Sequence, residues 1–417
     1  MLYISLIFGI IYKIFFNGEL IMNKKKLLPV LIPFIAAVLV VSALAVSGKV
    51  AKTAEINPTA TKAAAVEQTA EETTLPKKSK VTLVAVGDNL IHNTLIAAGE
   101  QDDGSLNYDS FYENIRPYIE KADIAVINQE TMLGGASFEY AGYPCFNTPW
   151  EVGEAAINAG FDVFTCATNH TMDVGSAGIE KELEFFSNHP EVTHIGTYAS
   201  EEDYNKITYY KKNDIKFALL NYTYGTNGIS IPEDKPYVVK MLTEENVRKD
   251  ITEARKNADF VIVFPHWGTE NSHEVNEQQR KYNKIFLELG VDLVIGTHPH
   301  VLQNVEWIKD EATGKKMLVY YSIGNFISHQ TSLNQMCGGM AKVTIERNGD
   351  DVSITNAKLT PVIDYYTRTG DGYKFSVYKL SDYNNDLADR QCQDGATVEY
   401  FTSLSKKVVD DEFLELD

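Results

Sequence analysis

The amino-acid sequence predicts an α/β fold in which two β-sheets pack as a sandwich flanked by helices. Up to about residue 300, short apolar runs rich in Val and Ile alternate with segments of helical period. After residue 300 the predicted segments are all strands, with a hairpin turn signal at Asn348-Gly349. Strands that alternate with helices, followed by a run of strands, indicate an α/β sandwich rather than one doubly wound sheet.

A candidate membrane anchor precedes this domain, within residues 1–47. Residues 27–46 form an uncharged stretch of 20 residues, and roughly 20 apolar residues suffice to cross the hydrocarbon layer. The lysines at 24–26 are expected to stay in the cytoplasm, which places the main domain outside a single-pass anchor at the cell membrane. The Ala-Leu-Ala run at 43–45 also fits a signal-peptide cleavage site, so a secreted protein is the alternative.

Residues 48–80 are predicted to form a disordered linker between membrane and domain. They are rich in Ala, Thr, Glu, Lys and Pro and show no apolar periodicity, so they cannot bury enough surface to fold. The folded domain is expected at 81–365, with a C-terminal extension at 366–417.

Each strand is predicted from a short apolar run, and each helix from apolar residues that recur every three or four positions. The strands of the alternating part are expected at 81–86, 124–127, 162–166, 207–211, 216–220, 260–264 and 291–295. The helices between them are expected at 108–120, 151–159, 176–188, 244–257 and 276–289. The strands of the all-β part are expected at 301–307, 317–321, 340–347 and 352–362.

Composition and charge narrow the class of function. Charged residues make up 23% and hydrophobic residues 44% of the 417 residues, which is typical of a folded protein. The formal net charge of -19 at pH 7 argues against nucleic acid as a partner, because phosphate backbones require a basic surface. A polyanionic substrate would need a locally positive site. No GxxxxGK[ST] phosphate loop occurs, which sets aside a P-loop ligase.

Potential metal ligands follow directly after five of the predicted strands. Carboxylate oxygen, amide oxygen and imidazole nitrogen are ligands that suit Mn, Fe, Zn or a similar divalent ion. The residues at these strand ends are Asp88, Glu130, Asn169, His170, His266, His298 and His300. Each has an ordinary structural role when taken singly, but their shared position after apolar strands predicts one metal site.

His298 and His300 are central to this prediction. They follow the apolar run at 291–295, where Gly296 allows the chain to turn and Pro299 excludes helix between the two rings. The alternative interpretation is a polar loop whose histidines make only surface hydrogen bonds.

Together these motifs resemble the CapA family of capsule-synthesis proteins. The resemblance covers about residues 81–361. It rests on the motifs at 87–88, 128–130, 168–175, 266–270, 296–300 and 320–326. Proteins of this family take part in making poly-γ-glutamate capsule and are similar in fold to calcineurin-like metallophosphoesterases. The resemblance therefore implies a metallophosphoesterase-like β-sandwich flanked by helices, a part in capsule biosynthesis, and two divalent metal ions.

The resemblance also implies a role for each strand-end residue. One metal would be held by Asp88, Glu130 and His300. Glu130 would bridge to a second metal, whose other ligands would be Asn169, His266 and His298. His170, next to a ligand, would donate a proton to the leaving group.

Two departures from the phosphoesterase pattern leave open whether the first metal site is weak or empty. That pattern has a histidine two residues after the first aspartate, where this chain has Leu90, and the nearest candidate is His92. Its bridging residue is an aspartate, whereas this chain has Glu130, whose longer side chain can still reach.

Three further residues are candidates of second rank. Asp173 lies three residues after His170 and either orients that ring or serves as an N-terminal charge for the following helix. Glu270 and Asn325 follow strand-end motifs and either line the pocket or form loop hydrogen bonds.

Two functions from different classes remain open on the sequence. The first is a metal-dependent hydrolase outside the membrane that acts on a phosphoester or an anionic polymer. The second is a non-catalytic metal-binding subunit of a polymer synthesis or export complex, and the missing ligand at Leu90 favours it. Both predict the membrane and capsule or poly-γ-glutamate synthesis subunits as partners.

Overall fold

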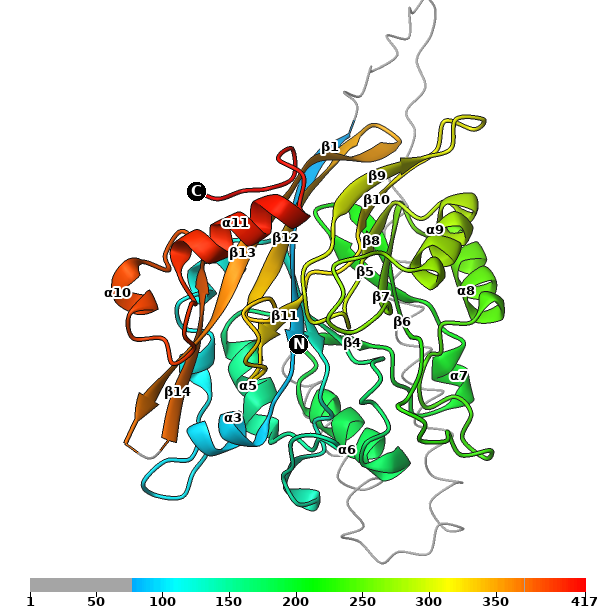
Figure 1. Cartoon of the computed structure of the whole chain (residues 1–417). Helices are drawn as coiled ribbons and strands as arrows, with labels where there is room; N and C mark the ends of the chain where they lie inside the picture. Colours follow the sequence, from blue (N-terminus) through cyan, green and yellow to red (C-terminus); the bar gives the residue numbers. More distant parts are fainter. Residues whose placement is uncertain (1–76, 371) are drawn as a thin grey trace, which may run out of the picture. The chain divides into compact units, whose positions relative to one another are not determined.

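A computed structural model of the chain describes residues 77–370 and 372–417 (Figure 1). The predicted anchor or signal segment at 1–47 and nearly all of the predicted linker lie outside these residues. Within the described ranges, no helix is both long enough and apolar enough to cross a membrane.

The first sheet has eight strands, with β1 (Lys78–Asn89) near its centre. On one side of β1 the strands are parallel, and on the other side they are antiparallel. Their order is β14 (Gly372–Lys379), β13 (Asp351–Thr369), β12 (Cys337–Asn348), β1, β2 (Ile124–Gln129), β3 (Val163–Thr165) and β4 (Thr193–Ile195). β11 (Asn325–Ile327) also pairs with β1, in parallel.

The second sheet has six strands and is also mixed. Its parallel core consists of β6 (Ile215–Thr223), β7 (Phe260–His266), β8 (Leu293–Ile295) and β10 (Lys316–Tyr320). β5 (Thr208–Lys212) and β9 (Val305–Lys309) form its antiparallel edges.

One hydrophobic core joins the inner faces of the two sheets. Ile127 and Phe164 of the first sheet belong to the same buried cluster as Ile262 and Leu293 of the second. Alternate residues of the second sheet, such as Val261 and Val263, face the other way into a second cluster beneath α8 and α9. Figure 1 shows these helices beside the second sheet. The predicted α/β sandwich with flanking helices is confirmed.

The helices are mostly short, and the longer ones cover the sheets. They are α3 (Asn93–Ala98), α4 (Arg116–Ile119), α5 (Trp150–Asn158), α6 (Gly175–Asn188), α7 (Glu201–Tyr204), α8 (Glu244–Asn257), α9 (Glu277–Leu289), α10 (Asn385–Ala388) and α11 (Val398–Val408), with 3-10 turns η2 (Asp109–Phe111) and η3 (Gly135–Ser137). α9 begins with a capping box between Asn276 and Gln279 and ends at Gly290 in the left-handed conformation. These caps fix the chain just before β8.

Two glycines let the strands that lead to the strand-end cluster approach other backbone closely. A Cβ atom at Gly87, next to Asp88, would lie 1.8 Å from the carbonyl oxygen of Gly324. A Cβ atom at Gly296, two residues before His298, would lie 2.2 Å from the carbonyl oxygen of Tyr321. Any larger residue at these positions would force the strand ends apart.

Two predicted elements were wrong in part. The helix expected at 108–120 is broken into η2 and α4, because Pro117 lacks an N–H and its ring is incompatible with a preceding helical turn. The strand expected at 301–307 begins only at Val305. His298 and His300 adopt positive φ angles of 98° and 58°, so the chain bends after β8 instead of extending.

The C-terminal extension predicted at 366–417 is part of the same folded unit. β13 runs past residue 365 to Thr369 and pairs with β14, which the sequence patterns did not reveal. Phe375 of β14 and Phe401 of α11 are buried in the core shared by the two sheets. The C-terminal residues therefore complete the first sheet.

Candidate metal centre

Asp88 anchors the first side of the candidate site. It lies near the end of β1 and is fully buried. Its Oδ1 accepts a hydrogen bond of 2.8 Å from Asn128 Nδ2, and its Oδ2 lies 3.0 Å from Nδ1 of His300. Oδ1 of Asn325, from β11, lies 3.0 Å from the same nitrogen. His300 Nδ1 is thus held by two oxygens, and its Nε2 is left for another partner.

Glu130 lies between two histidines without a hydrogen bond of its own. It follows β2 directly and is buried, and neither carboxylate oxygen has a hydrogen-bond partner in the described part of the chain. Its Oε1 lies 3.7 Å from Nε2 of His266 and 3.7 Å from Nε2 of His300. Burial, and then the neighbouring Asp88 carboxylate, raise the Glu130 pKa well above its usual range.

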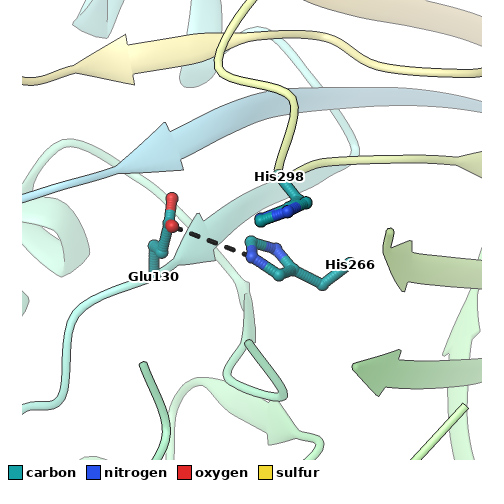
Figure 2. A group of neighbouring side chains, drawn as sticks. All are labelled: Glu130, His266 and His298. Carbon is teal, nitrogen blue, oxygen red and sulfur yellow. Dashed lines mark ion pairs between the residues drawn. The ribbon is translucent and has the colours of Figure 1, made fainter. Parts of the chain in front are cut away.

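His266 and His298 form the second side with Glu130 (Figure 2). His266 ends β7 and is held at both nitrogens, with Nδ1 2.9 Å from Thr297 Oγ1 and Nε2 2.8 Å from Asn169 Oδ1. The His298 ring lies 4.8 Å from the His266 ring between centroids. Its Nδ1 is buried and has no hydrogen-bond partner within the residues described.

The pKa values of the three histidines diverge. Burial lowers the pKa of His298 to about 3, and it lowers that of His266 well below its usual value, with neighbouring histidines adding to both effects. These two rings are therefore neutral, as metal ligands must be. Burial alone would also lower the His300 pKa, but the carboxylates of Glu130 and Asp88 outweigh it and raise that pKa to about 9.

The ligand atoms fall into two groups that share Glu130. One group is Asp88, Glu130 and His300, and the other is Glu130, His266 and His298. Within each group the ligand atoms lie within 4.8 Å of one another. Glu270, which is exposed, forms a third such group with His298 and His300.

This donor set fits divalent metal ions. A buried carboxylate without hydrogen bonds costs several kcal/mol unless positive charge compensates it. Glu130 is such a carboxylate, and it faces neutral imidazole on one side and the Asp88–His300 pair on the other. Asn169 Oδ1 adds an amide oxygen beside His266. Glu130 therefore lies where bound positive charge would compensate its carboxylate.

His170 and Asp173 form a separate pair beside this cluster. His170 Nδ1 lies 2.7 Å from Asp173 Oδ2, and the same oxygen accepts a hydrogen bond from the Phe146 backbone N–H at 2.7 Å. The Phe146 ring lies edge-on to the His170 ring at 4.7 Å. Asp173 precedes α6, but its Oδ2 is engaged by His170 and Phe146, which favours the orienting role over the role of a helix charge.

His92 does not occupy the place left by Leu90. Its Nδ1 lies 3.2 Å from the Leu90 carbonyl oxygen and 3.2 Å from the backbone nitrogen of His329. Within the described residues it belongs to none of the three ligand groups. The Leu90 side chain is itself buried. The group of Asp88, Glu130 and His300 therefore has three potential ligands. Neither Leu90 nor His92 supplies a fourth, as the sequence indicated for Leu90.

Comparison with known proteins identifies the family. The family model described as bacterial capsule synthesis protein PGA_cap matches residues 82–330. The chain belongs to this family. The resemblance to CapA proteins drawn from the sequence motifs is thereby confirmed.

The matches to individual relatives cover only part of this chain and only part of each relative. The chain is 30% identical over 191 residues to the "PGA biosynthesis protein CapA" of Bacillus subtilis (strain 168), covering 45% of this chain and 48% of that protein. It is 24% identical over 282 residues to the "Capsule biosynthesis protein CapA" of Bacillus anthracis, covering 66% of each. The chain thus spans about half to two thirds of these relatives.

A solved structure is similar at lower identity. The calcineurin-like phosphoesterase YfkN from Bacillus subtilis matches 79% of this chain and 97% of that chain, at 13% identity and a TM-score of 0.37. A superposition this loose carries no argument about the site, so the case for metal rests on the side chains of this PGA_cap protein itself.

Three polar residues that support the cluster were not among the sequence candidates. Asn128 holds Asp88, Thr297 holds His266, and Asn227 Oδ1 accepts a hydrogen bond of 3.1 Å from Asn169 Nδ2. Asn128 and Thr297 lie within the family motifs, two residues before Glu130 and one residue before His298, so their position was a usable signal. Asn227 lies in a loop with only an Asn-Gly turn signal, which gives no hint of a site.

Proposed function

We propose that this protein is a metal-dependent hydrolase, held outside the cell membrane, that acts in the biosynthesis of capsule or poly-γ-glutamate polymer. The observation that carries the proposal is the Glu130 carboxylate. It is buried, has no hydrogen bond among the described residues, and is shared by two groups of potential ligands. A purely structural carboxylate is normally satisfied by hydrogen bonds.

The side chains of the cluster have distinct tasks in such a reaction. Divalent ions held there, of Mn, Fe or Zn, would supply positive charge for the substrate oxygen and lower the pKa of a water molecule. Asn128, Asn325 and Thr297 keep the ligand side chains in fixed orientations. His170 holds a proton at Nε2, while the Asp173 carboxylate at Nδ1 stabilises the charged ring.

The family supports the proposed substrate class, and the sequence before the folded domain supports the proposed location. Two relatives carry the words capsule biosynthesis and PGA biosynthesis in their names, which supports an anionic capsule polymer as substrate. The apolar stretch at 27–46 supports a single-pass anchor, with capsule or poly-γ-glutamate synthesis subunits as neighbours in the membrane.

One observation favours a second function. The first ligand group has only three members, since Leu90 stands where the phosphoesterase pattern has a histidine. A protein with a weakened first site would serve as a metal-binding subunit of a polymer synthesis or export complex without hydrolysing anything itself.

A hydrolysis assay separates the two functions. We expect purified protein supplied with Mn²⁺ or Zn²⁺ to cleave an activated phosphodiester or a γ-glutamyl polymer. A chelator should abolish this activity, and added metal should restore it, because the proposed reaction depends on ions at the Glu130 cluster. Metal-loaded protein that cleaves neither substrate would support the subunit function instead.

A further inference from the structure

A cavity at the β13–β14 side of the first sheet differs in charge from the candidate metal centre. It has a volume of about 450 Å³ and is lined by residues of β13, β14 and the segments after β11 and α10. Its charged lining residues are Arg368 and Arg390, and no Asp or Glu lines it among the described residues. His329, Tyr366 and Tyr373 add aromatic surface. We call it the basic cavity.

Both guanidinium groups of the basic cavity are available to a ligand. Arg390 Nε donates a hydrogen bond to the Asp386 carbonyl oxygen at 3.0 Å, and the Arg368 guanidinium lies 5.5 Å from the centre of the Tyr373 ring. Neither forms an ion pair with a carboxylate within 77–370 or 372–417. Four other arginines do form such pairs, namely Arg116, Arg248, Arg255 and Arg347.

The wall between the arginines is fixed by hydrogen bonds and ring contacts. The Tyr366 backbone N–H donates to Gln391 Oε1 at 3.2 Å, and the Tyr366 hydroxyl donates to Gln393 Oε1 at 3.3 Å. The His329 ring lies edge-on to the Tyr366 ring at 4.8 Å and 5.1 Å from the Tyr373 ring. These contacts therefore hold the side chains that line the basic cavity in defined positions.

The loop after β11 connects the basic cavity to the metal centre. Gln330 Oε1 accepts a hydrogen bond of 2.8 Å from Asn325 Nδ2, and Asn325 Oδ1 contacts His300. His329, the preceding residue, lines the cavity. This loop thus contacts the Asn325 side chain that touches His300, and it also supplies part of the lining of the basic cavity.

We propose that the basic cavity is a subsite for the carboxylates of an anionic polymer whose scissile bond lies at the metal centre. This inference rests on the proposed function and adds to it the residues that would bind the polymer. A chain with net charge -19 repels a polyanion unless unpaired positive groups are concentrated where the polymer binds. Guanidinium groups bind carboxylates through paired N–H donors, and the polymer named for one relative, PGA, carries a carboxylate on each unit.

The test uses purified full-length protein and a fluorescently labelled poly-γ-glutamate oligomer, with binding followed by anisotropy at low and high salt. We expect Arg368→Gln with Arg390→Gln to weaken binding at least about tenfold, because two charge-assisted contacts are lost. The salt dependence of binding should fall as well. Arg280→Gln is the matched control, since Arg280 lines a different cavity that also contains carboxylates, and it should change affinity by no more than about twofold.

Two further readouts separate this inference from the proposed function. Cleavage of a small activated phosphodiester should be unchanged in the double variant, because such a substrate does not extend into the basic cavity. If wild-type protein cleaves no substrate, the proposed function is contradicted. The subsite is still tested in that case, because binding of the oligomer is measured separately. The subsite would be contradicted if wild-type protein failed to bind the oligomer. It would also be contradicted if the double variant bound the oligomer as tightly as wild type does. An equal or larger loss with polyphosphate would overturn the assignment to carboxylates.

Discussion

Glu130→Gln should remove both bound metal and activity. The carboxylate is the one group shared by the two ligand groups, and a neutral amide is a poor bridge between two cations. We expect turnover to fall by more than the roughly 10- to 100-fold that follows loss of a residue that merely supports a ligand. Metal content is measured by elemental analysis and turnover on an activated phosphodiester.

The stability of the metal-free variant provides the control for Glu130→Gln. In metal-free wild type, burial and Asp88 already raise the Glu130 pKa, so the ionised carboxylate opposes folding. The amide removes this charge with almost no change in shape. Urea unfolding of the metal-free proteins should therefore show the variant to be at least as stable as wild type. A variant that unfolds more easily would point to a structural role for the carboxylate.

His170→Asn should have a different signature, in which metal stays and turnover falls. His170 is hydrogen-bonded to Asp173 and belongs to none of the three ligand groups of the described chain. If it donates a proton, its loss should lower turnover by roughly 10²- to 10⁴-fold, the usual contribution of a general acid.

The companion variant Asp173→Asn tests the orienting role of the carboxylate. It should keep metal and reduce turnover less than His170→Asn, because the ring remains but loses the charge that stabilises its protonated form. Loss of metal in either variant would place His170 among the ligands. Full turnover in His170→Asn would exclude it as the proton donor.

Most strands of the alternating part could be predicted because they are buried and carry a continuous apolar run; β5 is the partly exposed exception. Parallel strands bring their carboxyl ends to one region, so polar residues directly after such runs were sufficient to assemble Asp88, Glu130, His266 and the two histidines after β8. Short strands such as β4 and β11 have only three residues and no such pattern. β14 has a glycine, a serine and two Tyr-Lys pairs on a partly exposed strand, so it lacks a continuous apolar run.

The side-chain partners of the site could be predicted less well than its ligands. Asn227 and the Arg368–Arg390 recess come from segments that follow no sequence period. Only tertiary packing brings Asn227 to Asn169 and the two arginines to one cavity. The same holds for Phe146, whose backbone N–H shares Asp173 with His170. Sequence spacing identifies which strand ends carry ligands, whereas loop conformation decides what surrounds them.

The most direct test of the metal centre is the metal content of His298→Ala with His300→Ala beside that of wild type. His300 belongs to one of the two groups that contain Glu130, and His298 belongs to the other. The double variant therefore deletes one potential ligand from each group. His189→Ala is the matched control, because His189 lies at the end of α6 and belongs to no ligand group of the described chain. We expect divalent metal in wild type and control and none in the double variant. Unchanged metal content in the double variant would contradict it.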